Sequence, residues 1–272
     1  MLLCGITVFS LLLSSRLVAL FDMALWLLPV LFVGFWLGSL LLAFLFLCLL
    51  FACVDLEKPQ EEDSPFYRFF MYLYIDALMV LAGLKMETAG LEKAPKDGRF
   101  LLVCNHQNEG DPAILMHYLK KSQLAFIAKK ESRDMFVVGK FMHKTMCQMI
   151  DRENDREALK TILKCIQMIK NDQVSVGVFP EGGIKIYGKL NPFRPGVFKI
   201  AQKANVPIVV CTLKGTDVLF HNMKHLKRTP VRLHLLDVIP AEELKGKTTV
   251  EISDRIHQMM LEDLGEDYRL ED

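Results

Sequence analysis

The stretch Phe100-Leu-Leu-Val-Cys-Asn-His-Gln-Asn-Glu-Gly-Asp-Pro112 decides how the rest of the chain is interpreted. Residues 100–104 form an apolar run of strand length. Residues 112–119 can begin a helix, with Asp111 at the N-cap and Pro112 at the first helical position. His106 therefore follows a buried strand just before a helix N-terminus, where α/β folds commonly place reacting groups. His106 and Asp111 can act as a base and its orienting carboxylate; the alternative is an ordinary strand–turn–helix junction with a surface histidine.

Beyond residue 99, apolar runs of strand length alternate with amphipathic stretches of helical period. The clearest helix is expected at 154–170, with Asn154 as its N-cap and Glu157 three residues on. Similar patterns favour helices at 196–204 and 250–264. The expected strands are 100–104, 124–128, 146–150, 174–179, 206–213 and 231–238. This alternation predicts an α/β fold, a mostly parallel sheet flanked by helices.

The N-terminal residues 1–54 are expected to anchor the chain in a membrane. Their only charged residues are Arg16 and Asp22, and residues 23–54 carry no charge. As a helix, that uncharged stretch would run about 48 Å, longer than one untilted crossing of a bilayer core. A signal peptide would have a much shorter apolar core. We expect at least one transmembrane helix within about 25–53, while residues 2–21 form either a second span or a surface segment.

The chain then divides into three further parts. Residues 55–63 are acidic and polar and read as a linker. Residues 64–98 open with an aromatic apolar stretch, 66–84, which suits a helix lying in the membrane interface or, alternatively, a core helix of the domain. The remaining residues, 99–272, form the globular domain.

Charge and cysteine usage restrict the class of protein. Residues 120–199 hold 16 Lys and Arg against 8 Asp and Glu, whereas residues 240–272 hold 4 against 10. The basic middle suits phosphate or anionic lipid, or is simply a solvated helical face. The seven cysteines include no CxxC pair, which favours reduced thiols in a cytoplasmic domain.

A second motif, Val178-Phe-Pro-Glu-Gly-Gly-Ile184, repeats the arrangement of a strand followed by a turn. Glu181 precedes two glycines, which allow close approach of backbone to a ligand; the alternative is a plain strand-ending turn. Cationic residues follow this motif and two other strands: Lys185, Lys189, Arg194, Lys129, Lys130 and Arg152. Since parallel strands end at one sheet edge, these cations are expected to converge on His106 and to suit a phosphate.

Together these blocks resemble the 1-acylglycerol-3-phosphate acyltransferase family. The His-x4-Asp signature matches His106 and Asp111, and the Phe-Pro-Glu-Gly block matches residues 179–182. Val206-Pro-Ile-Val, the Lys-Lys-Glu and Ile-Asp-Arg-Glu stretches, and the segment Ile239-Pro-Ala-Glu-Glu-Leu-Lys-Gly are similar too. The resemblance covers roughly residues 64–265. It implies a glycerolipid acyltransferase fold docked on a bilayer, with residues 99–272 as the acyltransferase domain.

The resemblance also implies a reaction. A fatty acyl group would move from acyl-CoA or acyl carrier protein, with no further cofactor, to the hydroxyl of lysophosphatidate. The implied catalytic pair is His106 as general base and Asp111 as its orienting carboxylate. The candidate substrate-binding residues are Asn105, Lys129, Arg152, Phe179, Pro180, Glu181, Gly182, Lys185 and Arg194.

Two departures from the family pattern are visible. Gly183 and Ile184 stand where the family usually has Thr-Arg, so its usual phosphate-binding arginine is missing. Lys185 or Arg194 would have to take its place. The other departure, Phe136 in place of a common proline, is minor.

Three alternatives remain open at the level of sequence. The same chemistry would serve another lysophospholipid or glycerol-3-phosphate as acceptor, or transfer between lipids. A non-catalytic lipid-binding or scaffold protein on this fold is the alternative from another class. His221 and His225 have metal-ligand spacing on a helix, but the stretch reads as a loop without a third ligand, so no metal site is expected. No nucleic-acid module is present, and the active site is expected to face the cytoplasm.

Overall fold

The computed structural model describes residues 1–270. In that range, seven strands form one sheet in the order β1-β7-β6-β2-β5-β3-β4. The strands are β1 Leu84–Ala89, β2 Leu101–Cys104, β3 Leu124–Lys129, β4 Gln148–Ile150, β5 Ser175–Val178, β6 Ile208–Lys214 and β7 Thr229–Ile239. β2 to β6 run parallel, whereas β7 pairs antiparallel with β6 and parallel with β1. The prediction of a mostly parallel sheet flanked by helices is confirmed.

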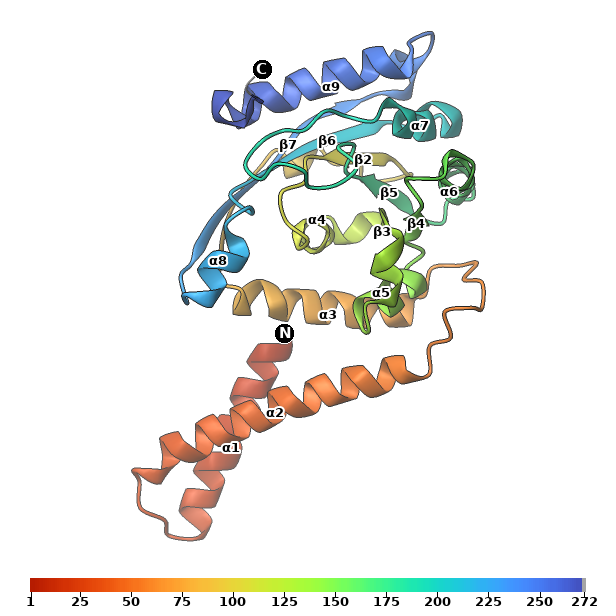
Figure 1. The fold of residues 1–272 in the computed structure, drawn as a ribbon. Helices are drawn as coiled ribbons and strands as arrows, with labels where there is room; N and C mark the ends of the chain where they lie inside the picture. Colours follow the sequence, from red (N-terminus) through yellow and green to blue (C-terminus); the bar gives the residue numbers. More distant parts are fainter. Residues whose placement is uncertain (271–272) are drawn as a thin grey trace.

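Helices cover both faces of the sheet (Figure 1). On one face lie α6 Asp155–Lys170, α7 Lys199–Ala204 and α9 Thr249–Leu264, and on the other α3 Pro65–Leu81, α4 Asp111–Tyr118 and α5 Val138–Lys144. Alternate residues of β2 point to opposite faces, as the pleat requires. Leu102 and Cys104 join the core under α3 and α4, and Leu101 and Val103 join the core under α6, α7 and α9.

The long helices expected in the domain are present, with small changes at their ends. Asn154 caps α6, and its side chain accepts hydrogen bonds from the backbone N–H groups of Arg156 and Glu157. Thr248 and Glu251 form a capping box on α9. The expected helix at 196–204 begins as a 3₁₀ turn, Pro195–Phe198, before α7. The expected strand at 146–150 is shorter, because Cys147 N–H is still bonded to the Met142 carbonyl of the turn that ends α5.

Three elements differ from the sequence interpretation. Residues 64–98 are not helical throughout: they contain β1, an edge strand of the sheet. α5 was not predicted. The stretch read as a loop around His221 contains a short helix, α8 Leu219–Lys224.

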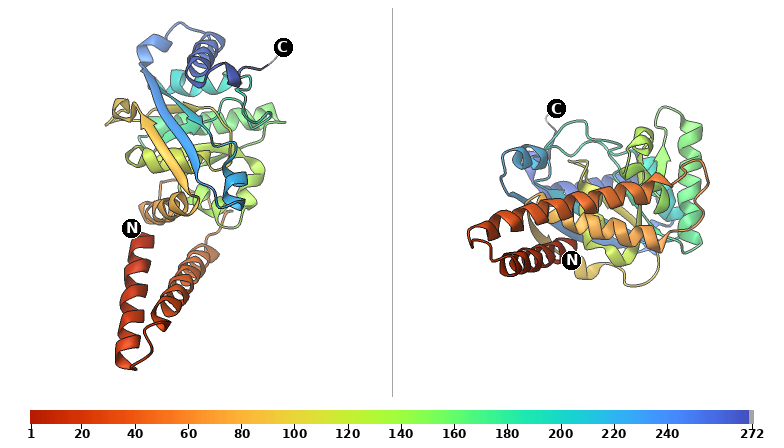
Figure 2. Two further views of the ribbon diagram at one scale, coloured as in Figure 1. Left: turned by 90° about the vertical axis from the view of Figure 1, so that its left-hand side faces the viewer. Right: turned by 90° about the horizontal axis from the view of Figure 1, so that it is seen from below.

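The N-terminal residues form a helical hairpin that projects from the domain (Figures 1 and 2). Its helices are α1 Leu2–Leu20 and α2 Leu27–Ala52, and both are long and apolar enough to cross a membrane. The sequence left open whether the chain has one span or two. By length and composition, both helices are candidate spans. They are compatible with membrane association, since most of their surface is exposed.

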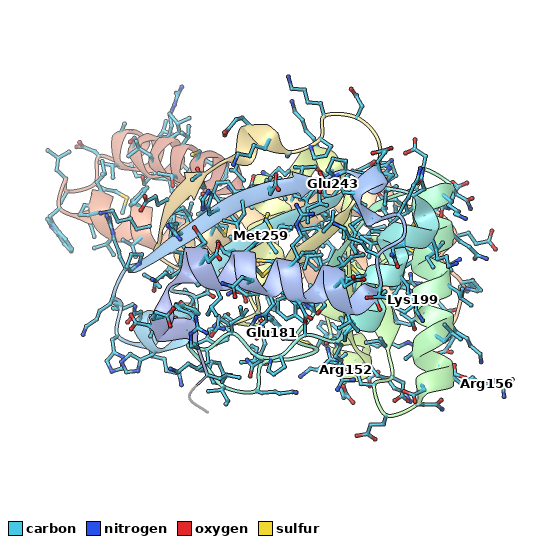
Figure 3. The ribbon with its side chains drawn as sticks, turned by 90° about the horizontal axis from the view of Figure 1, so that it is seen from above. Arg152, Arg156, Glu181, Lys199, Glu243 and Met259 are labelled. Atoms are coloured by element: carbon cyan, nitrogen blue, oxygen red, sulfur yellow. The ribbon has the colours of Figure 1, made fainter. Side chains whose placement is uncertain are left out.

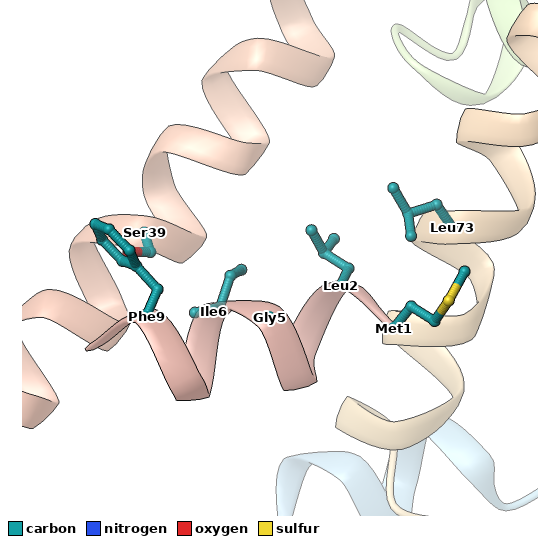
Figure 4. A pocket seen from close by; sticks show the side chains of 7 residues that line it. All are labelled: Met1, Leu2, Gly5, Ile6, Phe9, Ser39 and Leu73. Atoms are coloured by element: carbon teal, nitrogen blue, oxygen red, sulfur yellow. The ribbon is translucent and has the colours of Figure 1, made fainter. Parts of the chain in front are cut away.

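The end of α2 is packed against the domain. Phe51 is fully buried, with its ring 4.2 Å from that of Phe141 and 5.2 Å from that of Tyr67. Lys140 Nζ donates to the Phe51 carbonyl at 2.7 Å. Where the start of α1 and the middle of α2 face α3, an apolar hollow of about 400 Å³ lies between the hairpin and α3 (Figure 4). Its lining residues are Met1, Leu2, Gly5, Ile6, Phe9, Ser39 and Leu73.

Candidate active site

The turn between β2 and α4 brings His106 and Asp111 together. His106 Nδ1 lies 2.9 Å from Asp111 Oδ2, and the carboxylate is fully buried. The same oxygen accepts the backbone N–H groups of Gln107 and Asn108 at 2.7 and 2.8 Å. The sequence predicted Asp111 at the N-cap, but Asp111 is the first residue of α4 and the N-cap is Gly110. Its carboxylate folds back to organise the turn and orient the imidazole in the same contact.

The ring of His106 is fixed on one face. It stacks on Phe179, with centroids 4.1 Å apart, and Phe179 stacks in turn on Phe126 at 5.4 Å. The side chain of His106 is 16% exposed to solvent. Because Nδ1 faces Asp111 and no described residue hydrogen-bonds Nε2, Nε2 is the nitrogen available to an incoming hydroxyl.

The side chain of Glu181 holds the turn that carries His106 in place. Its Oε1 accepts the backbone N–H of His106 at 2.6 Å, and Oε2 accepts both the backbone N–H and Nδ2 of Asn191 at 2.8 Å. The side chain is fully buried. Burial raises the pKa of this carboxyl, and hydrogen bonds from Asn191 and His106 offset part of that rise. Both oxygens are therefore occupied, which favours a positioning role over direct contact with substrate.

Asn105 and Pro180 also hold backbone in place. The Asn105 side chain donates to the Leu213 carbonyl and accepts the Leu213 N–H, both at 2.8 Å, so it continues the pairing of β2 with β6. The Pro180 carbonyl accepts the backbone N–H of Arg194 at 2.8 Å. Both residues are buried, and their hydrogen bonds fix the backbone on which the site is built.

Two guanidinium groups flank the turn at Gly182 and Gly183. A Cβ on Gly182 would lie 2.7 Å from Arg194 Nε, and one on Gly183 would lie 3.0 Å from Arg152 Nη1. Both glycines have positive φ, 72° and 136°, which L side chains rarely adopt. Burial lowers the pKa of Arg152, and the neighbouring charge of Arg194 lowers it further, although Glu131 opposes this. Arg152 and Glu181 lie at the same edge of the domain, while Arg156 lies further out on α6 (Figure 3).

The two guanidiniums have no acidic partner at contact distance. Within residues 1–270, no carboxylate forms an ion pair with Arg152 or Arg194. Two neighbouring like charges without an acidic partner are suited to bind a polyanion such as a phosphate. Lys129 and Lys185 are exposed, and within residues 1–270 their side chains form no hydrogen bond or ion pair. No cluster of three metal-ligating side chains occurs in the described part of the chain.

Two residues that hold the site were not singled out in the sequence. Gln107 is fully buried; its Nε2 donates to the Lys189 carbonyl at 2.7 Å, and its Oε1 accepts the Gly188 N–H at 2.6 Å. It therefore links the turn that carries His106 to the loop of residues 185–194, which holds Lys185, Lys189 and Arg194. Asn191 does the same through Glu181. The only sign in the sequence that Gln107 holds the site is that it follows His106 directly. For Asn191 the sequence offers no such sign.

Comparison with known proteins gives a consistent assignment. A family described as Acyltransferase matches residues 85–214. A probable 1-acyl-sn-glycerol-3-phosphate acyltransferase of Mycoplasma genitalium is 31% identical over 196 residues, which are 69% of this chain and 72% of that relative. The chain belongs to the 1-acyl-sn-glycerol-3-phosphate acyltransferase family. The bovine 1-acyl-sn-glycerol-3-phosphate acyltransferase alpha is 28% identical over 219 residues, covering 80% of this acyltransferase and 75% of the bovine chain.

A solved structure supports the fold of this acyltransferase. The crystal structure of the lysophosphatidate acyltransferase PlsC from Thermotoga maritima superposes with a TM-score of 0.61 at 22% identity, covering 75% of this chain and 81% of that one. At that identity the likeness establishes the fold alone. Family membership establishes the enzyme class and, with it, an acyl donor and a lysophospholipid acceptor.

Proposed function

We propose that this acyltransferase moves a fatty acyl group from acyl-CoA or acyl carrier protein to the free hydroxyl of lysophosphatidate, giving phosphatidate. The contact of His106 Nδ1 with the buried Asp111 Oδ2 at 2.9 Å carries the proposal. The carboxylate fixes the tautomer and stabilises the imidazolium that forms. Nε2 of His106 takes the hydroxyl proton as the oxygen attacks the thioester carbonyl.

The reaction needs no nucleophile from the enzyme. The C–O bond of the new ester forms and the C–S bond of the thioester breaks, and the leaving thiolate receives the proton from the imidazolium of His106. Arg152 and Arg194 hold the acceptor phosphate beside the Gly182–Gly183 turn. Arg194 thereby supplies a guanidinium in place of the arginine missing at Ile184.

The hairpin α1–α2 holds the enzyme in the bilayer, and the site faces the cytoplasm. Two observations support this orientation and setting. Both helices are long and apolar enough to span a membrane. All seven cysteines lie within the described residues and are free, and Cys104, Cys147, Cys165 and Cys211 are buried in the domain, which suits a reducing compartment.

The experiment is a product profile from the purified full chain in phospholipid vesicles. With lysophosphatidate and acyl-CoA, or acyl carrier protein carrying the same chain, mass spectrometry is expected to find phosphatidate. Absence of phosphatidate with both donors would contradict the proposal.

A second candidate uses the same base with another acceptor. Gly183 and Ile184 in place of Thr-Arg favour it. Offering lysophosphatidylcholine, lysophosphatidylglycerol or glycerol-3-phosphate under a fixed donor separates the two candidates. A faster rate with one of these acceptors than with lysophosphatidate would support the second.

A further inference from the structure

The connection between β6 and β7 lies at the end of the domain nearest the hairpin. It contains α8, which Figure 1 shows at the same end of the domain as α3, and residues 225–228. The N–H of Thr229 donates to the Gly83 carbonyl at 3.1 Å, just after the C-terminus of α3. A Cβ on Gly83 would lie 3.8 Å from the Arg228 Cα. The end of the connection therefore lies next to the C-terminal end of α3, the helix that packs against the hairpin.

The same connection touches the catalytic turn. Leu219 is the buried residue of α8, 4% exposed. Its Cδ2 would lie 3.7 Å from a Cβ placed on Gly110, one residue before Asp111. The connection thus contacts the turn that carries His106 through Leu219 of α8, and Gly83, just after α3, through Arg228 and Thr229.

The outer side of this connection is apolar and unusually exposed. Phe220, Met223 and Leu226 are 47%, 40% and 95% exposed. Leu226 also has φ of 53°, a left-handed conformation in which leucine is unfavourable. Neither burial nor backbone preference accounts for a leucine there in water. The adjoining end of α3 adds Leu78, Val80 and Leu81, which are exposed in the same way.

Positive charge surrounds these apolar side chains. Lys224, Lys227 and Arg228 are exposed, and no carboxylate of the described residues pairs with them. Between 215 and 228 the sequence has one acidic residue, Asp217. Exposed apolar side chains ringed by lysine and arginine are the composition of a segment that lies in the interface of an anionic bilayer.

We propose that residues 218–228 are a second membrane-contact element, separate from the hairpin. Phe220, Met223 and Leu226 enter the boundary between headgroups and acyl chains, and the three cations contact lipid phosphates. Because Leu219 packs at Gly110, this contact sets the turn bearing His106 at the bilayer surface, where the acceptor hydroxyl lies. The inference rests on membrane docking of the hairpin, which belongs to the proposed function.

Depth-dependent quenching of single tryptophans tests the element. The native tryptophans are Trp26 and Trp36, both in the hairpin region, so replacing both with Phe gives a silent background in the full chain. Leu226→Trp in that background reports on the element. Val250→Trp is the matched control, because Val250 is 53% exposed on α9, across the sheet from α3. The proteins are reconstituted in vesicles of phosphatidylglycerol and phosphatidylcholine whose acyl chains carry bromine.

The proposal predicts that the Leu226→Trp protein loses most of its fluorescence to the brominated chains while the Val250→Trp protein keeps its own. The Trp26→Phe protein, which retains Trp36, reports docking of the hairpin. Quenching of Trp36 without quenching of the Leu226→Trp protein would overturn the inference and leave hairpin docking intact. If neither is quenched, both fail. Shielding of the Leu226→Trp protein by self-association, without lipid quenching, would also overturn the inference and favour a second copy as the occupant.

The charges are tested separately. Replacing phosphatidylglycerol by phosphatidylcholine is expected to weaken quenching of the Leu226→Trp protein. With Lys224, Lys227 and Arg228 each changed to Gln, quenching should no longer depend on the anionic lipid. An unchanged dependence would show that these cations do not contact the headgroups.

Discussion

Glu181 is bonded to the backbone of His106, so we expect it to position the imidazole without touching substrate. It accepts the His106 N–H on one oxygen and both Asn191 donors on the other. A glutamine cannot accept on both sides, since its NH₂ would face a donor and leave buried groups unpaired. Glu181→Gln is expected to cost about 1–3 kcal/mol in stability. It should also lower kcat and leave the KM values for lysophosphatidate and acyl-CoA nearly unchanged. Thermal unfolding would measure the loss of stability, and steady-state kinetics would measure kcat and the two KM values.

The control for that substitution is Glu243→Gln. Glu243 is exposed and pairs with Arg255 on the far side of the domain (Figure 3). The Glu243→Gln substitution should leave kcat and the melting temperature unchanged, since exposed ion pairs contribute little to stability. Equal losses in the two variants would refute a special role for Glu181.

Arg194 is predicted to determine acceptor affinity. Removing one charged donor to a phosphate costs about 1.5–3 kcal/mol, so Arg194→Ala should raise KM for lysophosphatidate about 10- to 100-fold and leave KM for acyl-CoA unchanged. Arg194→Lys should recover part of the loss, since a lysine lacks the bidentate geometry. Arg156→Ala, an exposed arginine outside the turn, is the control. A similar rise in both KM values would contradict the assignment.

At this scale the sequence predicted that His106 and Asp111 lie close together, but not the hydrogen bonds that hold the turn between them. His106, Asp111 and Glu181 lie within short motifs whose local turns place them. Gln107 and Asn191 were missed because their partners lie far away along the chain, on loops whose approach depends on the packed sheet. The sequence predicts that Asn105 and Glu181 contact substrate, whereas in the structure their polar atoms are bonded to backbone groups and to Asn191.

The carboxylate of Asp263 links helix α9 to strands β6 and β7 of the sheet. Asp263 accepts from Thr212 Oγ1 at 2.6 Å, from Arg232 Nη2 at 2.7 Å and from His234 Nδ1 at 2.8 Å. Burial alone would raise the pKa of Asp263, but the hydrogen bonds from Thr212 and His234 and the charge of Arg232 lower it below its ordinary value. The ionised carboxylate is therefore the form that stabilises the fold.

Asp263→Asn should lower the free energy of unfolding by about 1–3 kcal/mol at neutral pH. Because the folded-state pKa is lowered, the stabilisation is complete above the unfolded pKa of about 3.9 and is lost as pH falls through the folded value. The difference between wild type and variant should therefore shrink in acid, as thermal unfolding across pH would measure. Asp254→Asn, an exposed position on α9, serves as control. A difference that grows in acid would contradict the argument.

Among the elements, those with strong periodicity were predictable. α6 and α9 carry clear apolar stripes and caps, and the buried strands are continuous apolar runs. β1 was missed because it is an edge strand with mostly exposed residues, and nothing in Leu84–Ala89 distinguishes it from a connection. α5 and α8 are one to two turns long, and packing against the domain stabilises them where periodicity gives no signal.

The whole molecule has its hairpin and α3 at one end and α9 at the other (Figure 1). If the hairpin spans the bilayer with the domain in the cytoplasm, a surface cysteine in the domain should be protected in intact cells. Asp97 is exposed in a loop of the domain. Asp97→Cys should react with a membrane-impermeant maleimide in everted membrane vesicles and not in intact cells, with the parent chain as the background. Labelling in intact cells would place the domain on the outer face.

The central claim is that His106 removes the proton from a lipid hydroxyl, and one rate measures it most directly. Purified wild-type and His106→Ala proteins in vesicles are compared for phosphatidate formation from lysophosphatidate and acyl-CoA, together with equilibrium binding of lysophosphatidate. We predict that the variant loses about 10²–10⁴ in kcat, the usual contribution of a general base, while lysophosphatidate binding is retained. A variant that forms phosphatidate at the wild-type rate would contradict the account.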